Sequence, residues 1–256
     1  MAVIVSDDGT MAYAADSAPG DVYAVKVPSL SVAWKQHVGG APFGLLIHGG
    51  RLLVSLYSGD AVVELDPSSG ALLANDPITH HGAGMAVDLA GQVVVASDEG
   101  YLVALHGTST PGDRAFSAAL VAGGLWTADY TLGQISRSGD ATSRRKLPDP
   151  LHPFWVAPGA GGTLLISAEG QSEDSDPGAV YAYDVARDSF TLLDQPKDPD
   201  QAVQWGPAVV VAAHGSRRVD LIDAGRVIEW AKGAAAVAVA PDSGVNVLVV
   251  AVNAHE

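Results

Sequence analysis

The segment Pro42–Leu73 contains four short apolar runs, and turn-forming residues separate each run from the next. The runs are rich in Val and Leu, whereas the residues between them are mainly Gly, Pro, Asp and Ser. Apolar runs of about five residues with such boundaries are typical of β-strands joined by tight turns. Four antiparallel strands make a sheet that cannot bury both of its faces alone. The segment therefore needs similar sheets beside it.

The same pattern recurs along the whole chain at intervals of about forty residues. Six units of this kind are followed by a shorter one that supplies only two strands: Met1–Gly40, Pro42–His80, His81–Gly112, Ala115–Asp149, His152–Asp198, Gln201–Gly233 and Ala234–Glu256. No segment has a helical period. The repeats predict an all-β fold, a β-propeller of four-stranded antiparallel blades that forms a single domain over residues 1–256. We favour seven blades, the last incomplete, with six as the alternative.

Composition excludes several classes of partner. The formal net charge of −15 opposes binding to nucleic acid or to an anionic membrane, since both need clustered Lys and Arg. The chain has no cysteine, which excludes disulfides and thiolate chemistry. No run approaches the roughly 18–20 apolar residues of a membrane span, and the first residues lack the pattern of a signal peptide. We expect a soluble protein that is either cytoplasmic or exported with its leader removed.

Three segments resemble known propeller repeats. Ser6–Gly9 and Ala240–Gly244 are similar to the turn that links the first two strands in YVTN-type propellers, and Gly123–Gly139 resembles the repeats of NHL and virginiamycin B lyase-like propellers. The resemblance to the lyase implies catalysis by His and Glu residues on one face, with a divalent cation. His81, which a glycine follows, resembles the His-Gly pair at the start of that family's blades. Asp129 stands where its repeats often carry a Glu.

Propeller geometry sorts the polar residues between two faces. One face, which we call the mouth face, carries the connections between successive blades and the loops between the second and third strands of each blade. Six of the eight histidines are expected there, and the other two, His48 and His106, on the opposite face. Imidazoles and carboxylates that converge at a channel mouth can bind a divalent cation or supply a base near neutral pH. The alternative is that these loops are simply polar and hold no site.

The acidic loop Gly170–Gly178 also offers oxygen ligands to Ca²⁺. It lacks the regular alternation of an EF-hand, so a solvated loop is the favoured interpretation. Of the adjacent pair His80 and His81, we expect His81 to face the channel, because Gly82 allows the backbone to come close. Most tryptophans are expected to pack between blades.

These considerations define a candidate site. We predict His81, His152 and Asp129 as catalytic residues, and His81, His152 and His214 as ligands of a divalent metal ion, the one cofactor that the pattern suggests. The residues expected to contact a ligand are His37, Tyr57, Glu99, Tyr130, Trp155, Trp205, His214 and His255. The expected function is binding of a small molecule or a protein partner at the channel mouth, with no nucleic-acid or membrane partner. The alternatives are a metal-assisted lyase or hydrolase at the same face, and a scaffold that binds partners through its blade rims.

Overall fold

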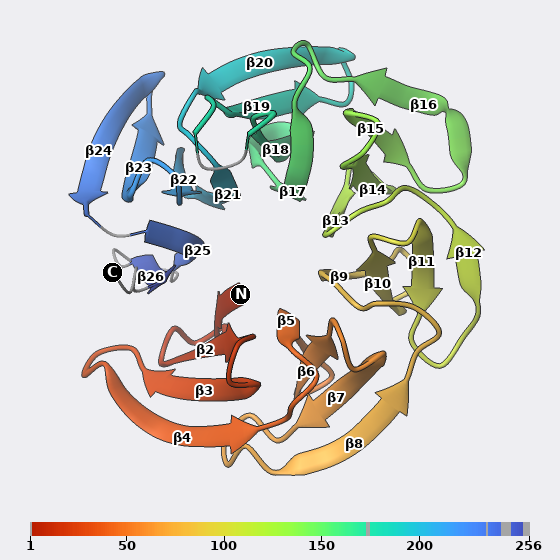
Figure 1. Ribbon diagram of the computed structural model, residues 1–256, viewed down its shortest axis with the longest axis vertical. Helices are drawn as coiled ribbons and strands as arrows, with labels where there is room; N and C mark the ends of the chain where they lie inside the picture. Colours follow the sequence, from red (N-terminus) through yellow and green to blue (C-terminus); the bar gives the residue numbers. More distant parts are fainter. Residues whose placement is uncertain (1, 173–174, 234, 242–246, 253–256) are drawn as a thin grey trace.

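The computed structural model is a ring of antiparallel sheets around a central axis (Figure 1). It describes the chain except for residues 1, 173–174, 234, 242–246 and 253–256. Six sheets have four strands each, paired in chain order from the innermost strand to the outermost. The prediction of an all-β propeller of four-stranded antiparallel blades is confirmed.

The first three blades comprise β1 (Ala2–Val5), β2 (Met11–Asp16), β3 (Asp21–Lys26) and β4 (Ser31–His37); β5 (Pro42–His48), β6 (Arg51–Leu56), β7 (Ala61–Leu65) and β8 (Leu72–Pro77); and β9 (Met85–Val87), β10 (Val93–Ser97), β11 (Tyr101–Ala104) and β12 (Ser109–Pro111). The next three comprise β13 (Ala118–Val121), β14 (Gly124–Asp129), β15 (Gln134–Arg137) and β16 (Asp140–Lys146); β17 (His152–Pro158), β18 (Thr163–Glu169), β19 (Ala179–Asp184) and β20 (Ser189–Asp194); and β21 (Pro199–Trp205), β22 (Ala208–Ala213), β23 (Arg218–Asp223) and β24 (Arg226–Lys232). A 3₁₀ turn, Ala160–Gly162, lies between β17 and β18 in the fifth blade.

The number of blades differs from the favoured prediction. The structure has six four-stranded blades rather than seven, because the last unit contributes only β25 (Ala235–Pro241) and β26 (Val247–Val252), which pair with each other as a two-stranded sheet. This sheet lies between the sixth and first blades, where β25 contacts β21 and β22 on one side and β1 on the other. Ala238 and Ala240 of β25 pack against Val3 of β1, so the ring closes through small apolar side chains.

Burial explains why the strands could be recognised in the sequence. The second strand of a blade is covered on both faces by the neighbouring blades, and every residue of β10 and β22 is buried. Such strands appear as continuous apolar runs. The outermost strands have one face in water, and β8 and β16 alternate between exposed and partly buried residues. Within the described part of the chain there is no helix with the length and apolarity that a membrane crossing needs.

A buried serine joins the second blade to the third. The Gly44 amide donates a hydrogen bond to Ser55 Oγ (2.8 Å), and Ser55 Oγ donates to the carbonyl of Ala83 (2.5 Å). A Cβ atom on Gly44 would lie 2.5 Å from that carbonyl oxygen, so only glycine permits this close approach. The serine satisfies two backbone groups that have no access to water.

We expect Ser55→Ala to lower the free energy of unfolding by about 1–3 kcal/mol, because it leaves a buried amide and a buried carbonyl without partners. Urea unfolding monitored by tryptophan fluorescence measures the change. Ser58→Ala, at an exposed position three residues along the same segment, is the control. Equal stability of the two variants would contradict this account of the interface.

Candidate ligand site at the channel mouth

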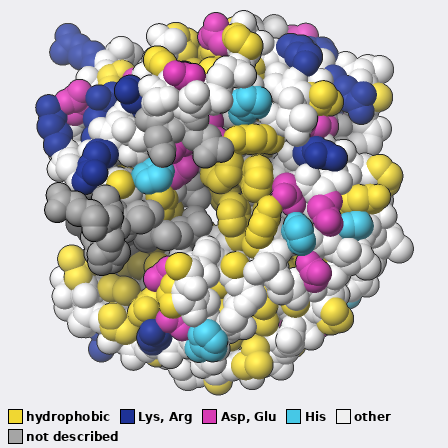
Figure 2. All heavy atoms as spheres, viewed as in Figure 1, with side chains coloured by type: hydrophobic (Ala, Val, Ile, Leu, Met, Phe, Trp, Pro, Cys, Tyr) yellow, Lys and Arg dark blue, Asp and Glu magenta, His cyan; other side chains and the backbone are white. Residues whose placement is uncertain are grey.

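Aromatic side chains from three blades meet at the mouth of the channel. Phe43 lies on β5, Phe116 lies two residues before the start of β13, and Phe154 lies on β17. The Phe116 and Phe154 ring centroids are 4.9 Å apart, and the Phe43 ring is 6.1 Å from Phe116 and 6.4 Å from Phe154. Figure 2 shows hydrophobic side chains gathered near the centre of this face, with acidic and histidine side chains beside them. Three of the four phenylalanines in the chain therefore form one cluster.

Irregular pairing at the start of the inner strands directs side chains into the mouth. The ladder between β5 and β6 skips Phe43 and Gly44, the ladder between β17 and β18 skips Phe154, and the ladder between β21 and β22 skips Asp200. The same irregularity occurs at Val237 of β25. A β-bulge bends the strand and redirects the side chain of the unpaired residue. Four inner strands use this device at the same level of the ring.

The four bulged residues line one cavity of about 560 Å³. Its walls are Ser17, Ala18, Ala41, Phe43, Tyr57, Phe154, Asp200, His214 and Val237. Apolar and aromatic groups dominate, and Asp200 and His214 place a carboxylate and an imidazole on one side. A cavity of this volume with a few convergent polar groups has the properties of a small-molecule site.

Two tyrosines extend the aromatic cluster and connect neighbouring blades. Tyr57, which follows β6, donates a hydrogen bond to Asp98 of the third blade (2.5 Å), and Tyr130, which follows β14, donates to Glu169 of the fifth (2.9 Å). Burial, reinforced by the hydrogen bond to Asp98, raises the pKa of Tyr57 to about 12. The Tyr57 hydroxyl therefore keeps its proton at neutral pH and acts as a donor.

His81 and His152 lie against these tyrosines. The His81 ring centroid is 5.1 Å from that of Tyr57, and its Nδ1 atom is 3.5 Å from Asp98 Oδ1. The His152 ring stacks on Tyr130 at 5.0 Å, and its Nδ1 atom is 2.9 Å from the Tyr130 carbonyl oxygen. Each histidine thus contacts one of the two tyrosines that extend the aromatic cluster.

His214 forms the most compact polar group of the mouth. Its Nδ1 atom is 2.9 Å from Asp198 Oδ2 and 3.9 Å from Asp200 Oδ2. One ligand atom from each of the three residues can be chosen so that all lie within 4.8 Å of one another. Burial and the nearby Asp198 carboxylate raise the pKa of Asp200 to about 8, and His214 opposes the shift. Asp200 is therefore mainly protonated at neutral pH unless a cation is close.

The other predicted residues lie away from this cavity or have structural contacts. His37 pairs with Asp21 (3.0 Å) in the first blade, and Glu99 pairs with His80 (2.9 Å), whose ring stacks on Tyr101. Asp129 is buried and accepts a hydrogen bond from the Leu132 amide (2.7 Å), which stabilises the loop after β14. The remaining sequence-predicted histidine, His255, lies outside the described residues.

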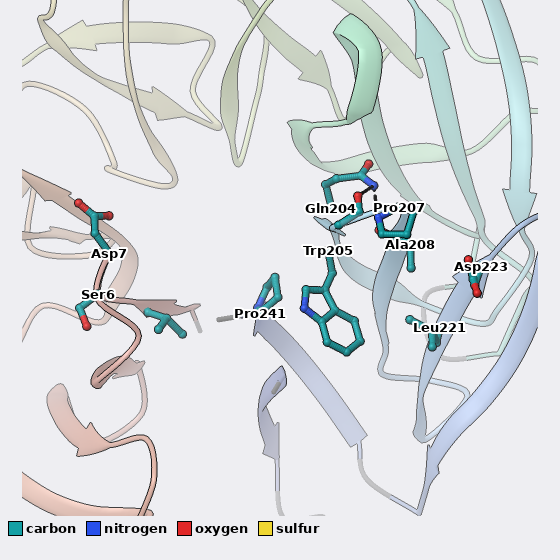
Figure 3. A pocket seen from close by; sticks show the side chains of 11 residues that line it. Ser6, Asp7, Gln204, Trp205, Pro207, Ala208, Leu221, Asp223 and Pro241 are labelled. Atoms are coloured by element: carbon teal, nitrogen blue, oxygen red, sulfur yellow. Dashed lines mark hydrogen bonds between the residues drawn. The ribbon is translucent and has the colours of Figure 1, made fainter. Parts of the chain in front are cut away.

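Of the two predicted tryptophans, Trp155 packs on the apolar cluster that contains Ala157 and Leu165. Trp205 ends β21 and so lies at the face opposite the mouth, where it lines a separate cavity of about 650 Å³ together with Pro207 and Leu221. Figure 3 shows the Trp205 ring beside Pro241, with Ser6 and Asp7 across the cavity. Trp205 also stacks on Trp230, at 5.8 Å between ring centroids.

The sequence did not single out Phe43, Phe116, Phe154, Asp198 or Asp200. One signal was present, because a proline begins or nearly begins the inner strands of three blades and the residue after it is the bulged one: Pro42-Phe43, Pro153-Phe154 and Pro199-Asp200. The bulges themselves depend on pairing with a partner strand and cannot be read from either strand alone.

No established family model matches this sequence, and none of the curated proteins matches it. Solved structures do match. The chain is a β-propeller. A catalytically inactive virginiamycin B lyase from Staphylococcus aureus with quinupristin superposes with a TM-score of 0.82 and 11% identity, over 98% of this chain and 90% of that one. Hydrazine synthase from Kuenenia stuttgartiensis is also similar, with a TM-score of 0.76 and 12% identity over 98% of this chain and 95% of that one. A putative 6-phosphogluconolactonase from Bacteroides fragilis has a TM-score of 0.69 and 14% identity over 97% of this chain and 86% of that one. The predicted resemblance to lyase-like propellers is confirmed for the fold, and at these identities it extends no further.

The raised pKa of Asp200 leads to a prediction about stability. The folded protein holds a proton on this carboxyl up to about pH 8, whereas the unfolded chain loses it near pH 4, at the ordinary carboxyl value. The unfolded state binds fewer protons between these limits, so the contribution of Asp200 to stability falls as pH rises through them.

Asp200→Asn cannot ionise and does not undergo this loss. We expect the Tm of the variant minus that of the wild type to be more positive at about pH 8.5 than at about pH 5. Asp60→Asn, which replaces an exposed carboxylate, is the control and should show no such trend. A Tm difference for Asp200→Asn that stays constant over this range would contradict the assignment.

Proposed function

We propose that the protein binds a small amphipathic molecule in the mouth cavity. The apolar part of the ligand would lie against Phe43 and Phe154, and a cationic or hydrogen-bond-donating group would face Asp200. The observation that carries this proposal is the convergence of four bulged residues, from four different sheets, on one cavity of about 560 Å³. Bulges distort pairing, and their concentration at one cavity is typical of a functional position.

The polar side of the cavity favours a positively charged group. Asp200 and His214 are its polar titratable lining residues apart from Tyr57, and no Lys or Arg is among the described residues that line it. Asp198 adds a second carboxylate beside them. A cation bound next to Asp200 would lower the pKa of that carboxyl and release its proton, so the affinity should increase as pH rises toward 8.

Matched aromatic probes test this proposal. We expect 2-phenylethylamine to bind more tightly than 3-phenylpropionate, as measured by ligand-observed NMR titration, because only the amine can pair with Asp200. Phe154→Ala should weaken amine binding by about tenfold, since it removes an aromatic wall, and Asp200→Asn should remove the preference for the amine. Phe190→Ala, which changes the fourth phenylalanine, is the control, because that ring packs on Tyr181 and Tyr183 in the fifth blade.

Equal binding of the two probes, or binding that neither mouth variant changes, would refute this site. The protein partner that the sequence also suggests stays a prediction. The same Phe154 and Asp200 variants would weaken binding of such a partner if it inserts a side chain into the cavity.

A divalent-metal function, as a lyase or hydrolase, is the second candidate. The observation in its favour is the group Asp198, Asp200 and His214, which offers two carboxylates and an imidazole within 4.8 Å. Its chemistry fits a dication, because a cation would offset the burial and the repulsion from Asp198 that raise the pKa of Asp200. When bound, such an ion would supply Lewis-acid activation of a substrate oxygen or a nucleophilic water. His81 and His152, which lie against Tyr57 and Tyr130, are the candidate bases. Asp129, buried and engaged in its loop, would act only through the surrounding structure.

We expect the tag-free, chelator-treated protein to bind Zn²⁺ in calorimetric titration, and His214→Ala to weaken binding at the mouth by about tenfold or more. His37→Ala is the control, because His37 is well exposed and paired with Asp21 in the first blade. Retention of all zinc binding by the His214 variant would rule out this metal site. That result would not bear on the proposed amine binding.

A further inference from the structure

Glu64, Asp76 and His106 form a separate polar cluster where the second blade meets the third. Glu64 lies on β7 and Asp76 on β8, so both belong to the second blade, whereas His106 lies in the turn between β11 and β12 of the third blade. His106 Nδ1 is 3.7 Å from Asp76 Oδ1, and ligand atoms of the three residues can be chosen within 4.8 Å of one another. The cluster therefore spans the boundary between two blades.

We propose that these three residues bind a divalent transition-metal ion such as Zn²⁺ and thereby link the second blade to the third. An imidazole with two carboxylates is a ligand set that zinc accepts. Two ligand atoms on a tetrahedral zinc ion, each about 2.1 Å from the metal, lie about 3.4 Å apart. The His106 and Asp76 atoms are already close to that spacing. A histidine nitrogen and a carboxylate oxygen 3.7 Å apart are also too distant to share a hydrogen bond, so the two groups face each other without one.

One carboxylate of this cluster, that of Asp76, is poorly satisfied by the protein. The Glu64 side chain is only 8% exposed. Asp76 Oδ2 has essentially no solvent exposure and no hydrogen-bond partner within the described residues. Burial of such groups is costly unless a cation or donors compensate it. An ion between Glu64, Asp76 and His106 would compensate the Asp76 carboxylate.

Arg51 is the cation that now contacts Glu64. Its side chain is half exposed, so the guanidinium can move into solvent when an ion enters. Because Glu64 is nearly buried, the guanidinium is its present counter-charge, and an ion that binds Glu64 must displace it. Arg51 should thus oppose metal binding rather than assist it.

An ion has access to the cluster from solvent. A cavity of about 320 Å³ borders two of its three residues, Glu64 and His106, and is also lined by Arg51, His48 and Gln92. His48 is outside the three-residue cluster, although it lines the same cavity. The two histidines that the sequence placed away from the mouth thus both line a single pocket.

The test uses the full chain without an affinity tag, treated with a chelator, in the His214→Ala background so that the mouth cluster does not contribute. Calorimetric titration with ZnCl₂ should show one ion per chain. His106→Ala and Asp76→Asn should each weaken binding by about tenfold or more. His48→Ala, the matched control, should change the affinity by less than about twofold. Loading with Co²⁺ should produce visible absorption bands that His106→Ala abolishes.

Arg51→Gln separates a metal site from a structural ion pair. If Glu64 is a ligand, removal of the competing guanidinium should increase zinc affinity several-fold. Far-UV circular dichroism checks that each variant is folded. Three results would overturn the proposal. They are the absence of zinc binding in the His214→Ala protein, full zinc affinity in a folded His106→Ala variant in that background, and a zinc affinity that Arg51→Gln lowers. None of these results depends on whether the mouth binds an amine or a metal.

Discussion

The structure depends on face-to-face packing between neighbouring sheets. A four-stranded sheet leaves two apolar faces, and each blade buries them against the blades on either side. The second strands show this most clearly, since β10 and β22 are buried along their whole length. Because apolar burial is the dominant favourable term in folding, a blade has little stability outside the ring. Closure therefore matters, and β25 provides it by packing between β21, β22 and β1.

Close packing brings backbone groups into the boundaries between blades, where water cannot satisfy them. Ser55 addresses this between the second and third blades by bonding to Gly44 and Ala83. Ser117 has a similar role between the fourth and fifth blades, where its Oγ atom accepts a hydrogen bond from the Val156 amide (2.7 Å). Small hydroxyl side chains are suited to this position, because they fill little space and still pair with the backbone.

Function in such a ring comes from departures from regular pairing. At the mouth, bulges redirect Phe43, Phe154, Asp200 and Val237 into a common cavity, so the scaffold stays regular while its inner edge carries different side chains. Acidic groups recur beside histidines at two places, at Asp198 and Asp200 with His214, and at Glu64 and Asp76 with His106. Both arrangements place two carboxylates beside an imidazole, and both are suited to cations. Virginiamycin B lyase shares the fold with this chain, yet at 11% identity a shared fold is no evidence of shared chemistry.

The sequence by itself determined the strands, their turns and the all-β repeat architecture, because period-two patterns and turn residues act within a few positions. It also placed His81, His152 and His214 at one face and His48 and His106 at the other, since the ends of a strand follow from its turns. The tertiary structure decided which groups meet: His214 with Asp198 and Asp200, and His106 with Glu64 and Asp76 across a blade boundary. It also decided the six complete blades and the bulges at Phe154 and Asp200. These features arise from contacts between segments distant in the chain, and local patterns carry no information about the register or spacing of such contacts.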